Sequence, residues 1–404
     1  MARNQEVAFK FGLEPNQPAL SKRSDLWSAP LPTTRQAFNG GPAVCEMDEI
    51  TTYGDYFTAA HDFLSRDKYV MLTQAARWMT GRSVSPADID GVGLYLLKYG
   101  AFYHTAYITL SIFDRCLALV LNVAVSPAGR QVLPREHGCL LRLANEIPKP
   151  FWPKVFGRGK GQTEGRLNLT MFLGEWLTGF HEFHLTRKLP AGQLAIEVWD
   201  IDAGRRLLRG RPVLDLIRLA AAMLTCAYNP LTFGAIREWH HAAGDFVIHV
   251  AGGQVDMRMI SVRDYAPLIR LPEPDLTAVL DGLLLFLITI SLRLRLDRQD
   301  GMGALAAYPA AVVPAICQGF WYGLQSCLDW RKLPHDLLSG AKDYFDAHKI
   351  ERLAPMVQAV MDNYPATSDD RPIMQALADE HLTILARSLT AEKSACWSYI
   401  MPTI

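Results

Sequence analysis

The spacing of hydrophobic residues divides the chain into helical and extended segments. Residues 55–81, "DYFTAAHDFLSRDKYVMLTQAARWMTG", space their apolar positions as an amphipathic helix does. They follow a Pro- and Gly-punctuated leader, residues 1–46, for which the sequence predicts no regular structure. Residues 91–126 instead alternate β-branched and aromatic residues with polar ones, and "FDR" separates "AYITLSI" from "LALVLNVAV". This pattern predicts a β-hairpin.

A helix and two further strands are predicted next. In "VLPREHGCLLRLANEI", residues 132–147, one helical face carries Leu133, His137, Leu140, Leu141 and Ala144. "FWPKVFGRG" and "NLTMFLGEWLTG" are typical of short strands, with the glycine-rich "KGQTEGR" as a flexible connection. Because no Lys-Ser/Thr follows these glycines at the required spacing, a nucleotide P-loop is not indicated. The predicted order is strand, strand, helix, strand, strand.

From residue 211 onward the helical period of 3.6 residues returns, and only one hairpin, within residues 240–265, interrupts it. The uncharged run "GLLLFLITISL", residues 282–292, has 11 residues, whereas about 20 are needed to span a bilayer. It therefore predicts a buried helix. Beyond it, Arg293 and Asp297 lie four positions apart and predict a surface ion pair on a helix, or an arginine, Arg295 or Arg298, that reaches a phosphate.

Composition places the chain among globular proteins. Of 404 residues, half are hydrophobic, and 41 Lys and Arg balance 41 Asp and Glu, which favours neither a nucleic acid nor an anionic membrane as partner. Seven cysteines without a C-x-x-C pair predict reduced thiols. Since the N-terminal segment also lacks the apolar core of a secretory signal, we expect a cytoplasmic protein.

This order of elements resembles the two-lobed protein-kinase-like fold, in particular its aminoglycoside-phosphotransferase branch, over roughly residues 98–350. In that family a histidine-glycine-aspartate loop precedes a β-hairpin that delivers a second aspartate to magnesium; here "HHAAGDF" is followed by "VIHVAGGQVDMRMI". The resemblance implies an α+β protein with a flexible leader (1–46), a helical extension (47–97), a β-rich small lobe (98–190) and a mainly helical large lobe (191–404).

The resemblance also implies phosphoryl transfer from ATP or another nucleotide with Mg²⁺ to an unknown small-molecule or protein substrate. Asp245, with His241 beside it, would position the acceptor hydroxyl. Asp256 or Asp264 would hold the metal, because Mg²⁺ prefers oxygen ligands. In loop order, however, Ser261 lies nearer the family's metal aspartate than either carboxylate does.

Further residues would bind the nucleotide. Asn122 stands where the family has a lysine in the third strand, and Glu136 suits the helix glutamate that pairs with this lysine. Glu175 and Trp176, at the end of "FLGEW", would form the hinge and offer backbone groups to a flat ring. His249 stands where the family has an asparagine after the base aspartate.

Structural roles compete with these assignments. Asp245 could close a turn, Asp256 and Asp264 could lie on the solvated face of a hairpin, and Glu136 could be a surface residue of a helix. Two other functions therefore stay open. One is a kinase-like binding or regulatory protein without turnover. The other is a zinc hydrolase, in which His181 and His184 share a helical face and His240, His241 and Asp245 complete the site.

Overall fold

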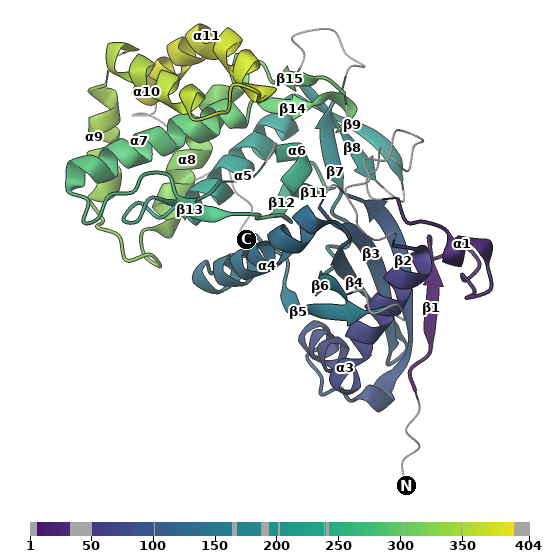
Figure 1. Ribbon diagram of the computed structural model, residues 1–404. Helices are drawn as coiled ribbons and strands as arrows, with labels where there is room; N and C mark the ends of the chain where they lie inside the picture. The colour runs from purple at the N-terminus through teal and green to yellow at the C-terminus, as the bar shows by residue number, and fades with distance from the viewer. Residues whose placement is uncertain are drawn as a thin grey trace. The chain divides into compact units, whose positions relative to one another are not determined.

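The chain forms two compact units. Unit 1 comprises Met1–Leu141 and Pro153–Thr178, and unit 2 comprises Arg142–Trp152 and Gly179–Ile404 (Figure 1). The computed structural model describes residues 6–32, 51–100, 102–163, 168–186, 194–200, 203–237, 239, 242–301, 303–348 and 350–391. An antiparallel sheet with an inserted helix precedes a mainly helical region, so the predicted α+β class is confirmed.

Unit 1 is built on a six-stranded sheet with the order β1-β2-β3-β4-β6-β5. Its strands are β1 (Phe9–Gly12), β2 (Ile89–Tyr99), β3 (His104–Ile112), β4 (Arg115–Ala124), β5 (Val155–Gln162) and β6 (Asn168–Glu175). Neighbouring strands are antiparallel except β1 and β2, which are parallel. Helix α4 (Pro127–Glu146) lies between β4 and β5 in the chain. The predicted order of hairpin, helix and two strands is confirmed, with β2 as an additional first strand.

The long helix α3 (Tyr53–Thr80) covers one face of this sheet. It begins with a capping box, in which Thr52 Oγ1 accepts from the amide of Asp55 and the Asp55 carboxylate accepts from the amide of Thr52, both at 3.0 Å. The backbone leaves the helical region at Arg66–Tyr69. Apolar side chains of α3 pack against alternate residues of the strands, such as Leu121 and Leu173. This packing forms the core of unit 1.

The residues that alternate with these point to the other face of the sheet. In β3, Ala106, Ile108 and Leu110 belong to the core under α3 and are fully buried, whereas Thr105 and Tyr107 lie on the other face and are only partly buried. Helix α4 covers part of this second face, where the ring of His137 lies 5.6 Å from that of Phe172. Leu141, predicted on the packed face of α4, is exposed, and Leu143 is buried instead.

The predicted boundaries within unit 1 differ from the structure. The leader contains β1, which pairs with β2, and the short helix α1 (Asp25–Ser28), so residues 6–32 are not a loose extension. The segment 47–97 contains α3 and most of β2, both integral to unit 1. The predicted flexible connection begins later than expected, because β5 continues to Gln162; residues 164–167 lie outside the described ranges.

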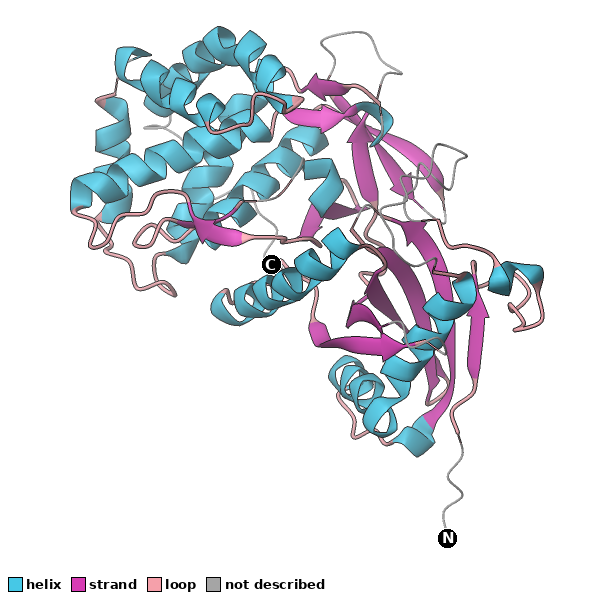
Figure 2. Ribbon diagram, in the orientation of Figure 1, coloured by secondary structure: helices cyan, strands magenta, loops and turns pink. Residues whose placement is uncertain are grey.

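Unit 2 consists mainly of helices (Figure 2). They are α5 (Arg211–Ala227), α6 (Ala242–Asp245), α7 (Leu276–Arg293), α8 (Val313–Cys327), α9 (Leu337–Asp346), α10 (Ile350–Asp362) and α11 (Asp370–Ala391). Helices α5 and α8 approach closely because Gly319 and Gly323 have no side chain. A Cβ atom at Gly319 would lie 2.2 Å from the Arg218 carbonyl oxygen, and one at Gly323 would lie 2.6 Å from that of Ala222.

The prediction of a single hairpin in unit 2 is wrong. Its described residues form four small sheets: β7 (Glu182–Leu185) with β8 (Ala195–Asp200) and β9 (Gly204–Arg209), β10 (Gly234–Ile236) with β13 (Tyr265–Pro267), β11 (Phe246–Ala251) with β12 (Gln254–Met259), and β14 (Leu296–Arg298) with β15 (Leu305–Ala307). Strands of three or four residues, such as β7, β10 and β14, are too short for a hydrophobic alternation to stand out, whereas β8 and β9 were missed although they have six residues each.

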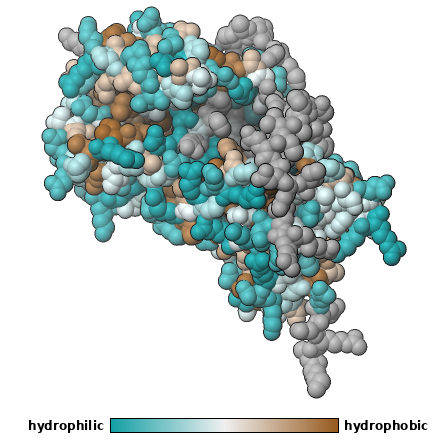
Figure 3. All heavy atoms as spheres, in the orientation of Figure 1, coloured by the Kyte–Doolittle hydropathy of each residue, from teal (hydrophilic) through white to brown (hydrophobic). Residues whose placement is uncertain are grey.

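Among the described helices, α7 is the one that is long and apolar enough to cross a membrane by length and composition. Most of it is buried inside unit 2, as Leu283, Leu284 and Leu287 are at 0% exposure, so the predicted buried helix is confirmed. Its first residue, Leu276, is exposed. Figure 3 shows small hydrophobic areas among hydrophilic residues over the helices of unit 2.

The predicted ion pair between Arg293 and Asp297 does not form, because α7 ends at Arg293. The Arg293 guanidinium donates to the carbonyl oxygen of Arg237 at 2.7 Å and covers the ring of Trp239 at 4.4 Å. Asp297 is buried and accepts from the amide of Leu185 at 2.7 Å. Arg295, a candidate phosphate ligand in the sequence, is 1% exposed and pairs with Glu380 at 3.0 Å.

Candidate functional site

The hairpin β11–β12 brings the chain back to the residue that precedes it. Asp245 is the last residue of α6, and β11 begins at Phe246. The turn Gly252–Gly253 has φ values of 57° and 79°, a conformation that glycine adopts without strain. After β12 the amide of Ile260 donates to the carbonyl oxygen of Asp245 at 2.8 Å. Residues 260–263 therefore lie beside Asp245, and the predicted hairpin is confirmed.

Asp245 forms a buried ion pair with Arg263. The Arg263 Nη2 atom lies 2.7 Å from Asp245 Oδ1, and the two side chains are 13% and 0% exposed. The arginine neutralises a carboxylate that would be costly to bury alone. A carboxylate that positions a hydroxyl must reach the substrate. In this arrangement the Asp245 carboxylate is fully buried and is not accessible to a substrate.

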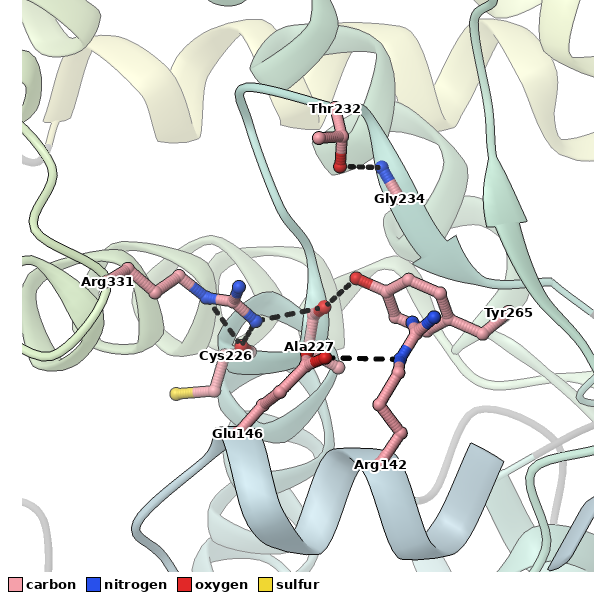
Figure 4. Close-up of polar contacts among 8 residues, drawn as sticks. All are labelled: Arg142, Glu146, Cys226, Ala227, Thr232, Gly234, Tyr265 and Arg331. Carbon is pink, nitrogen blue, oxygen red and sulfur yellow. Dashed lines mark hydrogen bonds and ion pairs between the residues drawn. The ribbon is translucent and has the colours of Figure 1, made fainter. Parts of the chain in front are cut away.

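The segment after β12 is anchored through Tyr265. Its hydroxyl donates at 2.8 Å to the carbonyl oxygen of Ala227, the last residue of α5, and Arg331 donates to the carbonyl oxygens of Cys226 and Ala227 (Figure 4). The Arg142 guanidinium covers the Tyr265 ring at 3.9 Å. Burial raises the pKa of Tyr265, so the phenol stays a hydrogen-bond donor. These contacts cap α5 and hold the residues beside Asp245 in place.

The predicted magnesium ligands are not brought together with Asp245 into a metal site. Asp256 Oδ1 lies 2.5 Å from Arg258 Nη1, and Asp256 faces His249 across the hairpin. Asp264 is partly buried, and its backbone carbonyl oxygen accepts from the amide of Arg237. No group of three or more His, Cys, Asp or Glu side chains in the described ranges could hold a metal ion. These residues do not fit Mg²⁺.

In unit 1 the predicted cofactor residues lie on the sheet face that α4 covers. Asn122 stands opposite Thr105 and Phe172 in the neighbouring strands, and its Oδ1 accepts from the Thr105 hydroxyl at 3.1 Å. Glu136 of α4 is 1% exposed, so it is not a surface residue of the helix. Its carboxylate accepts a hydrogen bond from the hydroxyl of Tyr103, in the β2–β3 connection.

The predicted strand and hinge residues end β6. Residues 172–175 belong to this strand, as the sequence predicted, and Trp176 follows it two residues before Thr178, where unit 1 ends. The Glu175 amide donates to the Lys154 carbonyl oxygen at 2.8 Å, and the Trp176 carbonyl oxygen accepts from the Thr178 amide at 3.0 Å. Two of the backbone groups proposed to bind a flat ring are therefore already hydrogen-bonded within unit 1.

The predicted zinc site is wrong in its geometry. His184 lies in strand β7 and His181 forms a β-bridge just before it, so residues three apart point to opposite sides rather than sharing a helical face. His181 Nε2 lies 3.4 Å from Asp200, and His184 Nδ1 lies 3.8 Å from Asp297. His240 and His241, the remaining candidates, lie outside the described residues.

His249 also has a structural contact. Its Nδ1 atom lies 2.8 Å from the carbonyl oxygen of Gly179, and its ring packs beside Phe180 at 5.6 Å. The two partners that the sequence did not indicate are Arg263 and Tyr103. Arg263 lies 18 positions after Asp245, so no local pattern in the sequence links the two residues. Nothing in the local sequence around Tyr103 points to Glu136, 33 residues away.

Comparisons with known proteins give likenesses among solved structures. No family model and no curated protein matches the sequence. Among solved structures 41 chains match, one of them described as "WaaP in complex with acyl carrier protein". That chain shares 12% identity and a TM-score of 0.29, over 64% of this chain and 86% of the other. At this TM-score the likeness carries no inference about activity or ligands.

Proposed function

We propose that this chain is a kinase-like binding or regulatory protein that does not transfer phosphoryl groups. The ion pair of Asp245 with Arg263 carries the proposal, because it withholds from substrate the one carboxylate that stands where a positioning base would be. Unit 1 supports it. Asn122 replaces the cation that would bind phosphate, and Glu136 accepts a hydrogen bond from Tyr103.

An active phosphotransferase of the aminoglycoside-phosphotransferase type, using ATP or another nucleotide with Mg²⁺, is the second candidate. The place of Asp245, directly before a β-hairpin, favours it. For catalysis Asp245 would have to leave Arg263 and become accessible, and breaking an ion pair in which the carboxylate is fully buried is unfavourable by several kcal/mol, on the order of 3–5. This energetic cost makes the binding protein the better supported function.

The ligand we propose to test first is a nucleotide. Purified protein is melted with ATP or GTP, in Mg²⁺ or in EDTA, since a ligand that binds the native state raises its apparent stability. The same samples are assayed for release of phosphate. We expect stabilisation by nucleotide without turnover. Absence of stabilisation by every nucleotide removes nucleotides as the ligand and leaves a binding protein for another partner.

Asp245→Asn separates the two candidates. Asn has nearly the same shape but cannot accept a proton, so a phosphotransferase would lose its turnover while a binding protein would have none to lose. Circular dichroism of the variant checks that the fold is kept. Nucleotide turnover in the wild type that disappears in a folded Asp245→Asn variant would establish the phosphotransferase and reject the proposal.

A further inference from the structure

The cation beside Asp245 is supplied by the chain itself. We propose that Arg263 takes the electrostatic place of a divalent metal ion at this point of unit 2, so that the site is complete without metal and binds its ligand independently of Mg²⁺. This inference rests on the proposed function, since it names the charge that stands at the proposed site. It concerns metal binding, which is measurable without any nucleotide.

Chain geometry makes the pairing a built-in feature. The backbone bond from Ile260 to Asp245 fixes the two segments against each other, and Arg263 follows three residues later. Its Nη2 atom reaches the carboxylate at 2.7 Å. The Tyr265 hydroxyl, bonded to the end of α5, holds the far side of the same segment. The segment that carries the guanidinium is thus anchored on both sides of Arg263, at Ile260 and at Tyr265.

A cation stabilises the ionised carboxylate of Asp245. The Asp245 side chain is at 0% exposure, and an ionised carboxylate without a partner is strongly disfavoured at such a position. A guanidinium stays charged at every pH at which the protein is folded, and its planar donors match a carboxylate. A metal ion that entered would meet a permanent positive charge within contact distance of its ligand.

The neighbouring side chains do not supply the additional oxygen ligands that a divalent metal ion would need. Mg²⁺ demands nearly octahedral oxygen coordination, usually with one or two carboxylates. Ser261 offers a hydroxyl at the position where the family resemblance places the metal aspartate, and it is buried at 6% exposure. Asp256, the other carboxylate of the hairpin, is held at 2.5 Å by Arg258. Asp245 and Asp256 therefore each have an arginine partner.

The test uses Mn²⁺ and Mg²⁺ alone on the full chain, with melting temperature and Mn²⁺ electron paramagnetic resonance as readouts. Wild type should show no stoichiometric Mn²⁺ binding and no metal-dependent stabilisation. Ser261→Asp/Arg263→Gln removes the cation and adds a second carboxylate. We expect this variant to melt below wild type in EDTA and to gain roughly 5 °C with saturating Mn²⁺.

Two further variants control the result. Asp245→Asn/Arg263→Gln removes both charges and should fold without responding to Mn²⁺. Arg258→Gln removes the other arginine of the hairpin and should also leave the protein indifferent to metal. If Ser261→Asp/Arg263→Gln does not fold in EDTA, refolding with Mn²⁺ is the readout, and recovery with metal alone supports the proposal.

Stoichiometric binding of Mn²⁺ to wild type would overturn the inference, as would equal metal responses of all variants. Both outcomes are measured by metal binding and melting temperature, and neither depends on enzymatic turnover. A wild-type protein that ignores metal but releases phosphate from nucleotide would reject the proposed function and leave the role of Arg263 intact. A metal-binding wild type without turnover would do the reverse.

Discussion

The hydroxyl of Tyr103 donates a hydrogen bond to the carboxylate of Glu136, which joins the connection between β2 and β3 to helix α4. Gly129 makes the approach sterically feasible, since a Cβ atom there would lie 1.7 Å from the carbonyl oxygen of Phe102 in the same connection. The connection is therefore packed directly on the first turns of α4. Glu136, 1% exposed, receives a neutral donor where the kinase-like resemblance implies a lysine.

Tyr103→Phe should destabilise the protein, because it removes a donor from a buried carboxylate and leaves the ring in place. The expected loss is about 1–3 kcal/mol in the free energy of unfolding, measured by urea denaturation. Tyr95→Phe is the matched control, since Tyr95 is also largely buried and its hydroxyl makes no hydrogen bond within the described residues. Equal effects of the two substitutions would contradict a specific role of the Tyr103 hydroxyl.

The close contact of α5 with α8 predicts the effect of Gly319→Ala. The added methyl group would meet the Arg218 carbonyl oxygen at 2.2 Å and push the two helices apart. We expect a loss of about 1–3 kcal/mol. Gly340→Ala in α9 is the control, because nothing lies within 4 Å of its Cβ position, and alanine should stabilise that helix by about 0.5–1 kcal/mol. Opposite signs in denaturant melts are the expected result.

Arg331 and Tyr265 should act together on the end of α5. Both donate to the Ala227 carbonyl oxygen, Arg331 at 3.2 Å and Tyr265 at 2.8 Å. Arg331→Met and Tyr265→Phe each leave one donor, whereas the double variant leaves this carbonyl without either. The double variant should therefore lose more stability than the sum of the single losses, by about 0.5 kcal/mol or more in a double-mutant cycle. Additive losses would show that the two caps are independent.

His381 should make stability depend on acid. It is fully buried in α11, its Nε2 lies 3.0 Å from the Ser291 hydroxyl and its Nδ1 lies 3.5 Å from Arg295, which also pairs with Glu380. Burial, and then the charge of Arg295, lowers the pKa of His381 from 6.5 to about 3. The unfolded chain therefore binds a proton at higher pH than the folded one. Stability from the neutral ring is present above pH 6.5 and lost progressively as the pH falls towards 3.

The measurement compares wild type with His381→Gln, which keeps polar atoms but does not titrate. Between pH 6.5 and 4 the unfolding free energy of wild type should fall more steeply than that of the variant, by at most about 1.4 kcal/mol per pH unit. His104, whose pKa burial lowers to about 4, contributes to both proteins and cancels in the comparison. Parallel pH profiles would exclude His381 as the titrating group.

Long helices and strands were predictable because the spacing of hydrophobic residues within one segment indicates which face of that segment is buried. The hydrophobic spacing of residues 55–81 indicated α3, and the alternation in residues 106–125 indicated the β3–β4 hairpin. Positions 246–259 likewise form a hairpin around two glycines. The strands β7, β10, β13, β14 and β15 were missed because each has only three or four residues, too few to show a pattern, and the six-residue strands β8 and β9 were missed as well.

The sequence by itself determined the α+β class, the order of the main elements and the placement of Asp245 at the start of a hairpin. Only the tertiary structure decided what these residues contact. Arg263 returns to Asp245 after a hairpin, and Tyr103 meets Glu136 from another element, so neither pair has a local signature. The physical reason is that the charge and hydrogen-bonding state of a buried side chain depend on its spatial neighbours, which a linear pattern does not specify.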